Sequence, residues 1–291
     1  MARHSQRGYT LYLRGGCRVV LTFTTLGYTT AGIYAASWAC YLGKLFAGSR
    51  WTGRLATALL AAGMATHYFA LLQRAYSIHS VPYQDLYGST SLLAWFLALT
   101  YLGLELLHRE RAMGAFVLPL VLLLLGLELV VAPHAAPRSP ARGAIFALHV
   151  TSNILAYSAF TLSFVYSLVY LVQDYLLRGR RTVAMMWRLP PLEDLERMAR
   201  SGVWVGLGSL IVGISFGMAV DRNLTGQMLT PDPKVVISFL ILAFYAMYLT
   251  VSRLPAWRGA RASVLCMASY FAVVFSYTIV NLYLSSFHRF Y

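Results

Sequence analysis

Long apolar runs recur along this chain and are separated by short polar segments. Each run holds about 20 residues, the length that a helix needs to cross a hydrocarbon core of roughly 30 Å. We predict spans at residues 19–42, 55–76, 87–107, 113–131, 144–172, 202–220, 235–251 and 262–285. The pattern therefore predicts an all-α integral membrane protein, a bundle of about eight transmembrane helices.

The domain organisation follows from what separates the runs. No Gly/Ser linker divides the chain, and no repeat of 20 to 50 residues stands out. The first apolar run is too long for a cleaved leader and lacks a clean small-residue cleavage site. We therefore expect residues 1–18 to form a retained basic tail and residues 19–291 to form a single polytopic membrane domain.

Composition narrows the function classes. Of the 291 residues, 58% are hydrophobic and 12% are charged. A net charge of +14 would suggest a nucleic-acid partner for a soluble protein, but here most Lys and Arg lie in short loops. Cys17, Cys40 and Cys266 form no C-x-x-C pair, which disfavours a thiol relay and a covalent c-type cytochrome. We predict no nucleic-acid partner, and no motif for covalent catalysis is present.

The loop charges suggest an orientation. Loops after the first, third, fifth and seventh predicted helices hold fourteen of the 24 Lys and Arg. The positive-inside rule then predicts that both termini lie on the extracytoplasmic side, although the basic tail argues for the reverse. We expect the membrane to be a bacterial inner membrane. In this topology four histidines share the extracytoplasmic face, which suggests a haem or metal site there. They are His79, His134, His149 and His288.

His149 and His288 are the preferred ligand candidates. His149 falls about one turn inside the fifth predicted helix, and His288 falls just beyond the eighth. Two imidazoles on neighbouring helices can bind one haem from opposite faces. The alternative is that His149 hydrogen-bonds a neighbouring helix and that His288 sits among the lipid headgroups.

Four other ionisable residues each have two possible roles. His67 lies deep in the second predicted helix, where it is either a ligand or a buried hydrogen-bonding residue. Glu128, in the fourth, raises the same question. His79 and His134 lie near the outer face, where each is either an accessory residue of the site or a surface residue.

Two connecting segments stand out. In residues 178–201, a Pro-Pro step at 190–191 precedes acids, which predicts the start of a short amphipathic helix. In residues 221–234, Gly226, Pro231 and Pro233 favour turns, so this segment is either a lid over an outer site or an ordinary connector.

Several short motifs, taken in order, resemble the cytochrome c assembly family of the CcsA and HemX type over residues 55–291. The first is His79-Ser80-Val81-Pro82-Tyr83-Gln84-Asp85-Leu86-Tyr87, followed by Leu93-Ala94-Trp95. The others are Leu148-His149-Val150, Leu189-Pro190-Pro191-Leu192-Glu193, Asp232-Pro233-Lys234, Trp257-Arg258-Gly259 and Val280-Asn281-Leu282 before Phe287-His288.

The resemblance implies that His149 and His288 match the two outer histidines that hold haem in this family. His67 looks like an intramembrane histidine of the HemX-like members. The resemblance also implies haem b as the cofactor, with a ResB-like membrane protein and an apocytochrome c as partners.

Two departures change this expectation. Residues 223–231 contain no Trp, where the family carries a Trp-rich segment, and Thr250 stands where assembly members carry a histidine. One haem b, or none, is therefore expected rather than two. The alternatives are a haem-handling protein that retains or delivers haem and a HemX-like accessory or structural subunit, with or without an electron-transfer haem. A solute permease is disfavoured because no matched repeat halves are visible.

Overall fold

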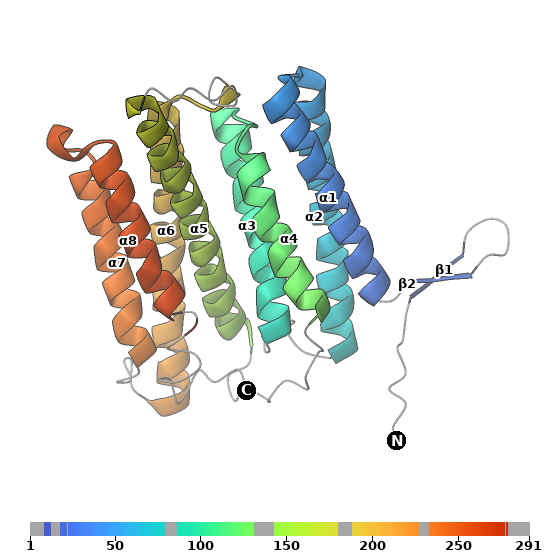
Figure 1. Cartoon of the computed structure of the whole chain (residues 1–291). Helices are drawn as coiled ribbons and strands as arrows, with labels where there is room; N and C mark the ends of the chain where they lie inside the picture. The colour runs from blue at the N-terminus through green and yellow to red at the C-terminus, as the bar shows by residue number, and fades with distance from the viewer. Residues whose placement is uncertain are drawn as a thin grey trace.

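The computed structural model describes residues 9–12, 18–21, 23–78, 86–130, 143–179, 188–226, 233–276 and 278. Eight α-helices make up the bundle, and η2 (Pro255–Trp257), a short 3-10 helix, joins the last two (Figure 1). The helices are α1 (Phe23–Ala47), α2 (Arg50–Ile78), α3 (Leu86–His108), α4 (Gly114–Val130), α5 (Ala144–Arg178), α6 (Leu192–Thr225), α7 (Pro233–Val251) and α8 (Ala260–Phe275).

Four of these helices, α2, α3, α5 and α6, are long and apolar enough to cross a membrane. Within the described residues, α4, α7 and α8 contribute shorter apolar stretches. Every predicted span overlaps one helix, so the expected helical class is confirmed. The passage of all eight helices through the bilayer stays a prediction.

The chain departs from the predicted pattern before α1. The strands β1 (Tyr9–Tyr12) and β2 (Arg18–Leu21) form an antiparallel hairpin, with Tyr9 opposite Leu21. Val19 and Val20 are β-branched, and such residues favour an extended strand that can pair with a second one. The hairpin therefore joins the basic tail to the first residues of the predicted span, and α1 begins at Phe23 rather than at Val19.

The amphipathic segment before the sixth span is also different from the prediction. It is not a separate short helix, because α6 runs without interruption from Leu192 to Thr225. Pro191 precedes the helix, and Glu193 and Asp194 lie in its first turn, where the helix dipole favours acids. No Pro interrupts the helix before residue 225, so the polar first turns continue directly into the apolar span.

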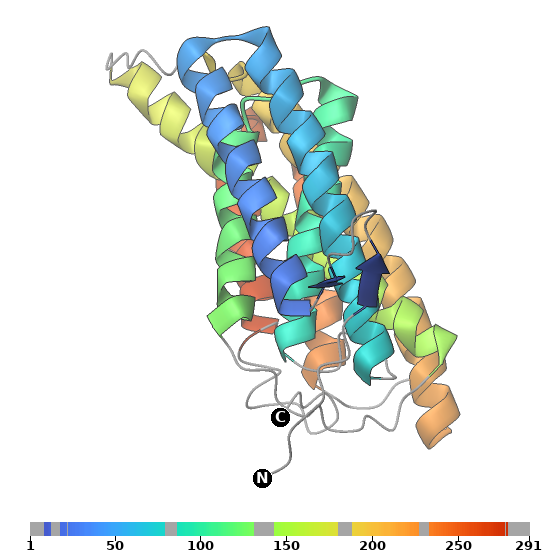
Figure 2. The same ribbon diagram turned by 90° about the vertical axis from the view of Figure 1, so that its right-hand side faces the viewer.

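The helices run alternately up and down. The C-terminal ends of α1, α3, α5 and α7 lie at the upper end of Figure 1, together with the start of the helix that follows each. We call this the basic end, because twelve of the fourteen basic residues counted above are described there, within residues 44–54, 108–111, 178–179, 188–200 and 253–261. Figure 2 shows the same alternation from the side of α1 and α2. We call the opposite end, where α5 begins, the His149 end.

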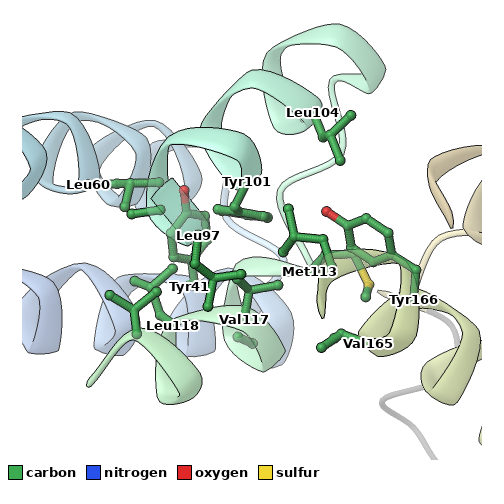
Figure 3. Packing of buried hydrophobic residues seen from close by; sticks show 14 of the residues in the cluster. Tyr41, Leu60, Leu97, Tyr101, Leu104, Met113, Val117, Leu118, Val165 and Tyr166 are labelled. Carbon is green, nitrogen blue, oxygen red and sulfur yellow. The ribbon is translucent and has the colours of Figure 1, made fainter. Parts of the chain in front are cut away.

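The two largest apolar clusters among the described residues both include α5, and a third, small one joins Leu71, Leu92 and Ile154. The larger cluster includes residues of the five helices from α1 through α5 and of the first turns of α6. Figure 3 shows Tyr41, Leu97, Met113 and Tyr166 from this cluster. The second cluster joins α5 and α6 to α7 and α8, and in it the Phe160 ring stacks on Tyr245. Because α5 is packed on several sides, it is a fixed support for His149.

Candidate functional site

The His149 imidazole is oriented by the backbone of the neighbouring helix. Its Nδ1 lies 2.8 Å from the carbonyl oxygen of Gly213 on α6. A carbonyl oxygen can only accept a hydrogen bond, so Nδ1 carries the proton and donates it. The lone pair of the neutral ring is then on Nε2, which is the arrangement found when a backbone carbonyl orients a metal-bound histidine.

Asn153, one turn further along α5, supports the same turn of the helix. Its Nδ2 donates to the His149 carbonyl oxygen at 2.7 Å and lies 3.3 Å from the ring Nδ1. Both of these nitrogens are donors in the tautomer described above. The bond to Gly213 is therefore the one that orients the ring.

Two glycines of α6, one turn apart, make room for this part of α5: Gly217 for the His149 ring and Gly213 for the Asn153 amide. A Cβ atom on Gly217 would stand 2.8 Å from both Cε1 and Nδ1 of His149. A Cβ atom on Gly213 would stand 2.8 Å from the Asn153 amide nitrogen. The imidazole thus occupies a slot that exists because α6 has no side chains there, and we call it the glycine slot. A haem iron needs such an oriented imidazole, so His149 fits the role of an axial ligand.

His67 has a different setting in the middle of α2. The side chain is buried, with 2% of its surface exposed. Its Nε2 lies 3.0 Å from the Ser91 hydroxyl on α3, and its Nδ1 lies 3.5 Å from the Tyr34 hydroxyl on α1. These are the contacts of a buried hydrogen-bonding residue. A metal ion at His67 would have to replace one of the two hydroxyls.

The other histidine candidates fall outside the described residues. They are His79, His134 and His288. The backbone of Glu128 belongs to α4, but its side chain is also outside them. Of the segment 221–234, residues 221–225 continue α6 and residues 233–234 begin α7, so the segment between the helices is shorter than predicted. Residues 227–232 lie outside the described residues, and the lid stays a prediction. The pairing of His149 with His288 therefore stays a prediction. Among the described residues, no three His, Cys, Asp or Glu side chains gather where they could hold a metal ion.

Thr250 lies on α7, where it points away from the core. Its hydroxyl donates to the carbonyl oxygen of Ala246 in its own helix at 2.8 Å. A threonine hydroxyl bonded in this way is no substitute for an imidazole at an iron.

A buried carboxylate that the sequence interpretation passed over lies near the basic end. Only 1% of the Glu105 surface on α3 is exposed. Tyr41 of α1 donates to its Oε2 and Thr57 of α2 donates to its Oε1, both at 2.5 Å. Arg111, in the α3–α4 connection, brings its Nε to 3.5 Å from Oε1. The signal was an acid within an apolar run, the same signal that drew attention to Glu128.

This cluster, Glu105 with Tyr41, Thr57 and Arg111, ties three helices and one connection together. We call it the Glu105 cluster. Figure 3 shows Tyr41 and Tyr101 from this region beside Leu97 and Leu60. It belongs to the end of the bundle opposite His149, so it supports the fold rather than the histidine site.

Comparisons with known proteins agree with this architecture. The family model described as "Cytochrome C assembly protein" matches residues 83–288. Protein HemX of Brevibacillus brevis is 28% identical over 222 residues, which cover 76% of this chain and 82% of that protein. The cytochrome c biogenesis protein CcsA of Heterosigma akashiwo is 25% identical over 250 residues, covering 74% of this chain and 78% of that protein.

A solved structure has the same fold. The cytochrome c heme lyase CcmF superimposes with a TM-score of 0.61 at 16% sequence identity, over 89% of this chain. The chain spans 47% of the length of that protein. With the family model covering most of α3 to α8, the chain belongs to the cytochrome c assembly protein family.

Proposed function

We propose that this chain is an integral membrane protein that handles haem in cytochrome c biogenesis. It holds haem b at the extracytoplasmic face, either to retain it or to deliver it. The observation that carries this proposal is the oriented His149 imidazole in the glycine slot. The names of the relatives, a CcsA protein and a heme lyase, support the same role.

His149 and His288 are the proposed axial ligands of the haem iron, and His79 and His67 are further candidates for the cofactor site. A bound haem supplies an iron centre that accepts two imidazole nitrogens. The chain's own contribution at His149 is clear. The Gly213 carbonyl keeps the proton on Nδ1, and Gly217 leaves room for the ring.

The orientation and partners belong to the same proposal. The twelve basic residues described at the basic end favour the cytoplasmic side for that end, which leaves the His149 end outside. We infer a bacterial inner membrane, a ResB-like membrane partner and an apocytochrome c that receives the haem. The chain acts as a binding and assembly factor rather than as an enzyme with covalent turnover.

A second candidate function is favoured by the similarity to protein HemX. The matched region covers 82% of the length of that protein. In this case the chain is an accessory or structural subunit of a membrane complex, with or without an electron-transfer haem. Deleting the gene separates the two functions. Haem delivery predicts that apocytochrome c accumulates without haem, whereas an accessory role leaves holocytochrome c at its normal amount.

The absorption spectrum of the purified protein tests haem binding itself. We expect the spectrum of a bis-imidazole haem b, and we expect its loss in His149→Ala and in His288→Ala. A colourless wild-type protein that also fails to take up added haem would overturn the proposal.

A further inference from the structure

An open groove lies on the surface of the bundle at the basic end, where the chain turns from α7 into α8. Its volume is about 490 Å³, and Trp257, Ala260, Arg261 and Val264 line it. The wall is almost wholly apolar apart from the Arg261 head, and 43% of the Trp257 surface is exposed. The groove thus combines one cation and one interfacial aromatic ring with an apolar floor.

The apolar floor continues down α8. Exposed side chains follow Arg261 at Val264, Ala268, Phe271 and Phe275, three or four residues apart. With a rise of 1.5 Å per residue, the fourteen-residue step from Arg261 to Phe275 spans ~21 Å. One leaflet of the hydrocarbon core measures about half of 30 Å. The track is therefore long enough to accompany one acyl chain through its leaflet.

The charges around the groove are of one sign. Arg253, Arg258 and Arg261 are exposed within nine residues, and the sequence contains no Asp or Glu after Asp232. None of the ion pairs among the described residues involves these three arginines.

Two acids of the helices that pack against this hairpin are paired within their own helices. On α5, Asp174 accepts from Arg178 at 2.9 Å, and on α6, Glu196 accepts from Arg200 at 2.6 Å. Arg261 also donates from Nη1 to the carbonyl oxygen of Ala256 at 2.8 Å, a contact that leaves its positive charge without a counter-ion. An anion of external origin is therefore the natural partner of the three arginines. Guanidinium groups bind phosphate oxygens in a two-point geometry that an ammonium group cannot make.

The groove is held in place by a close backbone contact. Gly259 has φ 76°, and a Cβ atom there would stand 2.5 Å from the Tyr170 hydroxyl oxygen on α5. Because the turn lies directly against α5, Trp257 and Arg261 are carried by a fixed segment.

We propose that this groove binds an anionic phospholipid, with its phosphate at Arg258 and Arg261 and one acyl chain along Val264 and Phe271. A zwitterionic lipid has no net charge to offset the three arginines. A juxtamembrane basic residue contributes about 1 kcal/mol to the binding of acidic lipid, which is roughly fivefold per arginine. The site is independent of the haem proposal, since it uses only the α7–α8 hairpin.

Quenching of Trp257 fluorescence tests this proposal. The full chain is placed in phosphatidylcholine vesicles that contain brominated phosphatidylglycerol or, at the same mole fraction, brominated phosphatidylcholine. The difference between wild type and Trp257→Phe isolates the signal of Trp257. We expect Trp257 to prefer brominated phosphatidylglycerol by at least roughly fivefold.

The double variant Arg258→Gln/Arg261→Gln should quench equally with both lipids. Arg50→Gln/Arg54→Gln is the matched control, because it removes two positive charges from the same end of the bundle but from another hairpin. It should keep the preference. Equal quenching of the wild type by the two lipids would overturn the proposal, as would an unchanged preference in the Arg258/Arg261 variant.

Discussion

Removal of the Glu105 carboxylate should loosen the basic end of the bundle. In Glu105→Ala, the Tyr41 hydroxyl loses its acceptor while it remains fully buried. A buried donor without a partner costs about 1–3 kcal/mol. Thr57 and Arg111 lose less, because the single hydroxyl hydrogen of Thr57 can turn to the Gly53 carbonyl oxygen at 3.0 Å and Arg111 is partly exposed.

The lost packing of the side chain adds to this cost. Each buried methylene contributes about 0.8 kcal/mol, so the whole change should lower the free energy of unfolding by about 2–4 kcal/mol. Glu105→Gln keeps a carbonyl oxygen that can accept from Tyr41, and we expect a loss of about 1 kcal/mol. Tyr41→Phe in the Glu105→Ala background removes the stranded hydroxyl.

Unfolding in mixed micelles of dodecyl maltoside and sodium dodecyl sulfate, followed by circular dichroism, measures these differences. The Glu105→Ala/Tyr41→Phe double variant should be about 1–3 kcal/mol more stable than the sum of the two single changes predicts. Strict additivity, or a loss below about 0.5 kcal/mol in Glu105→Ala, would refute the view that this cluster holds the helices through its hydrogen bonds.

Three further outcomes are expected. Gly217→Ala should displace the His149 ring and weaken haem uptake in a titration with haem, whereas Gly208→Ala, where a Cβ atom meets nothing within 4 Å, should leave it unchanged; equal behaviour of the two variants would refute the glycine slot. Burial and then the charge of Asp194 raise the pKa of Glu110, so its contribution to stability is present at low pH and is lost as the pH rises above the ordinary value of 4.5. As the pH rises above 4.5, the melting temperature of the wild type should therefore fall relative to that of Glu110→Gln. An unchanged difference between the two melting temperatures across this pH range would contradict the prediction. If His67 is a ligand, His67→Ala should change the number of haems per chain in a pyridine haemochrome assay; an unaltered number and spectrum would leave it as a hydrogen-bonding residue.

The helices could be predicted from the sequence because each apolar run is a local signal. The alternation of the loops between two ends also followed, since it needs only the order of the spans and the positions of Lys and Arg. The ends of the helices were less predictable. α2 begins at Arg50 and α6 begins at Leu192, several residues before the predicted spans. Their first turns contain charged residues, which a hydropathy window does not include.

The setting of His149 could not be predicted, because it depends on a residue 64 positions away on another helix. The sequence did carry a signal, the pair Gly213 and Gly217 at the spacing that lets two membrane helices approach closely. Glu105 was missed for a related reason. An acid within an apolar run is a local signal, as at Glu128, but the partners Tyr41 and Thr57 that give Glu105 its role come from two other helices.

Chemical rescue of His149 tests the haem proposal most directly. In His149→Gly the imidazole is removed and the slot is left open, so free imidazole can enter beside the Gly213 carbonyl. We predict that the bis-imidazole haem spectrum is lost in this variant and returns when imidazole is added. A spectrum that survives the substitution unchanged, before any imidazole is present, would contradict the assignment of His149 as an axial ligand.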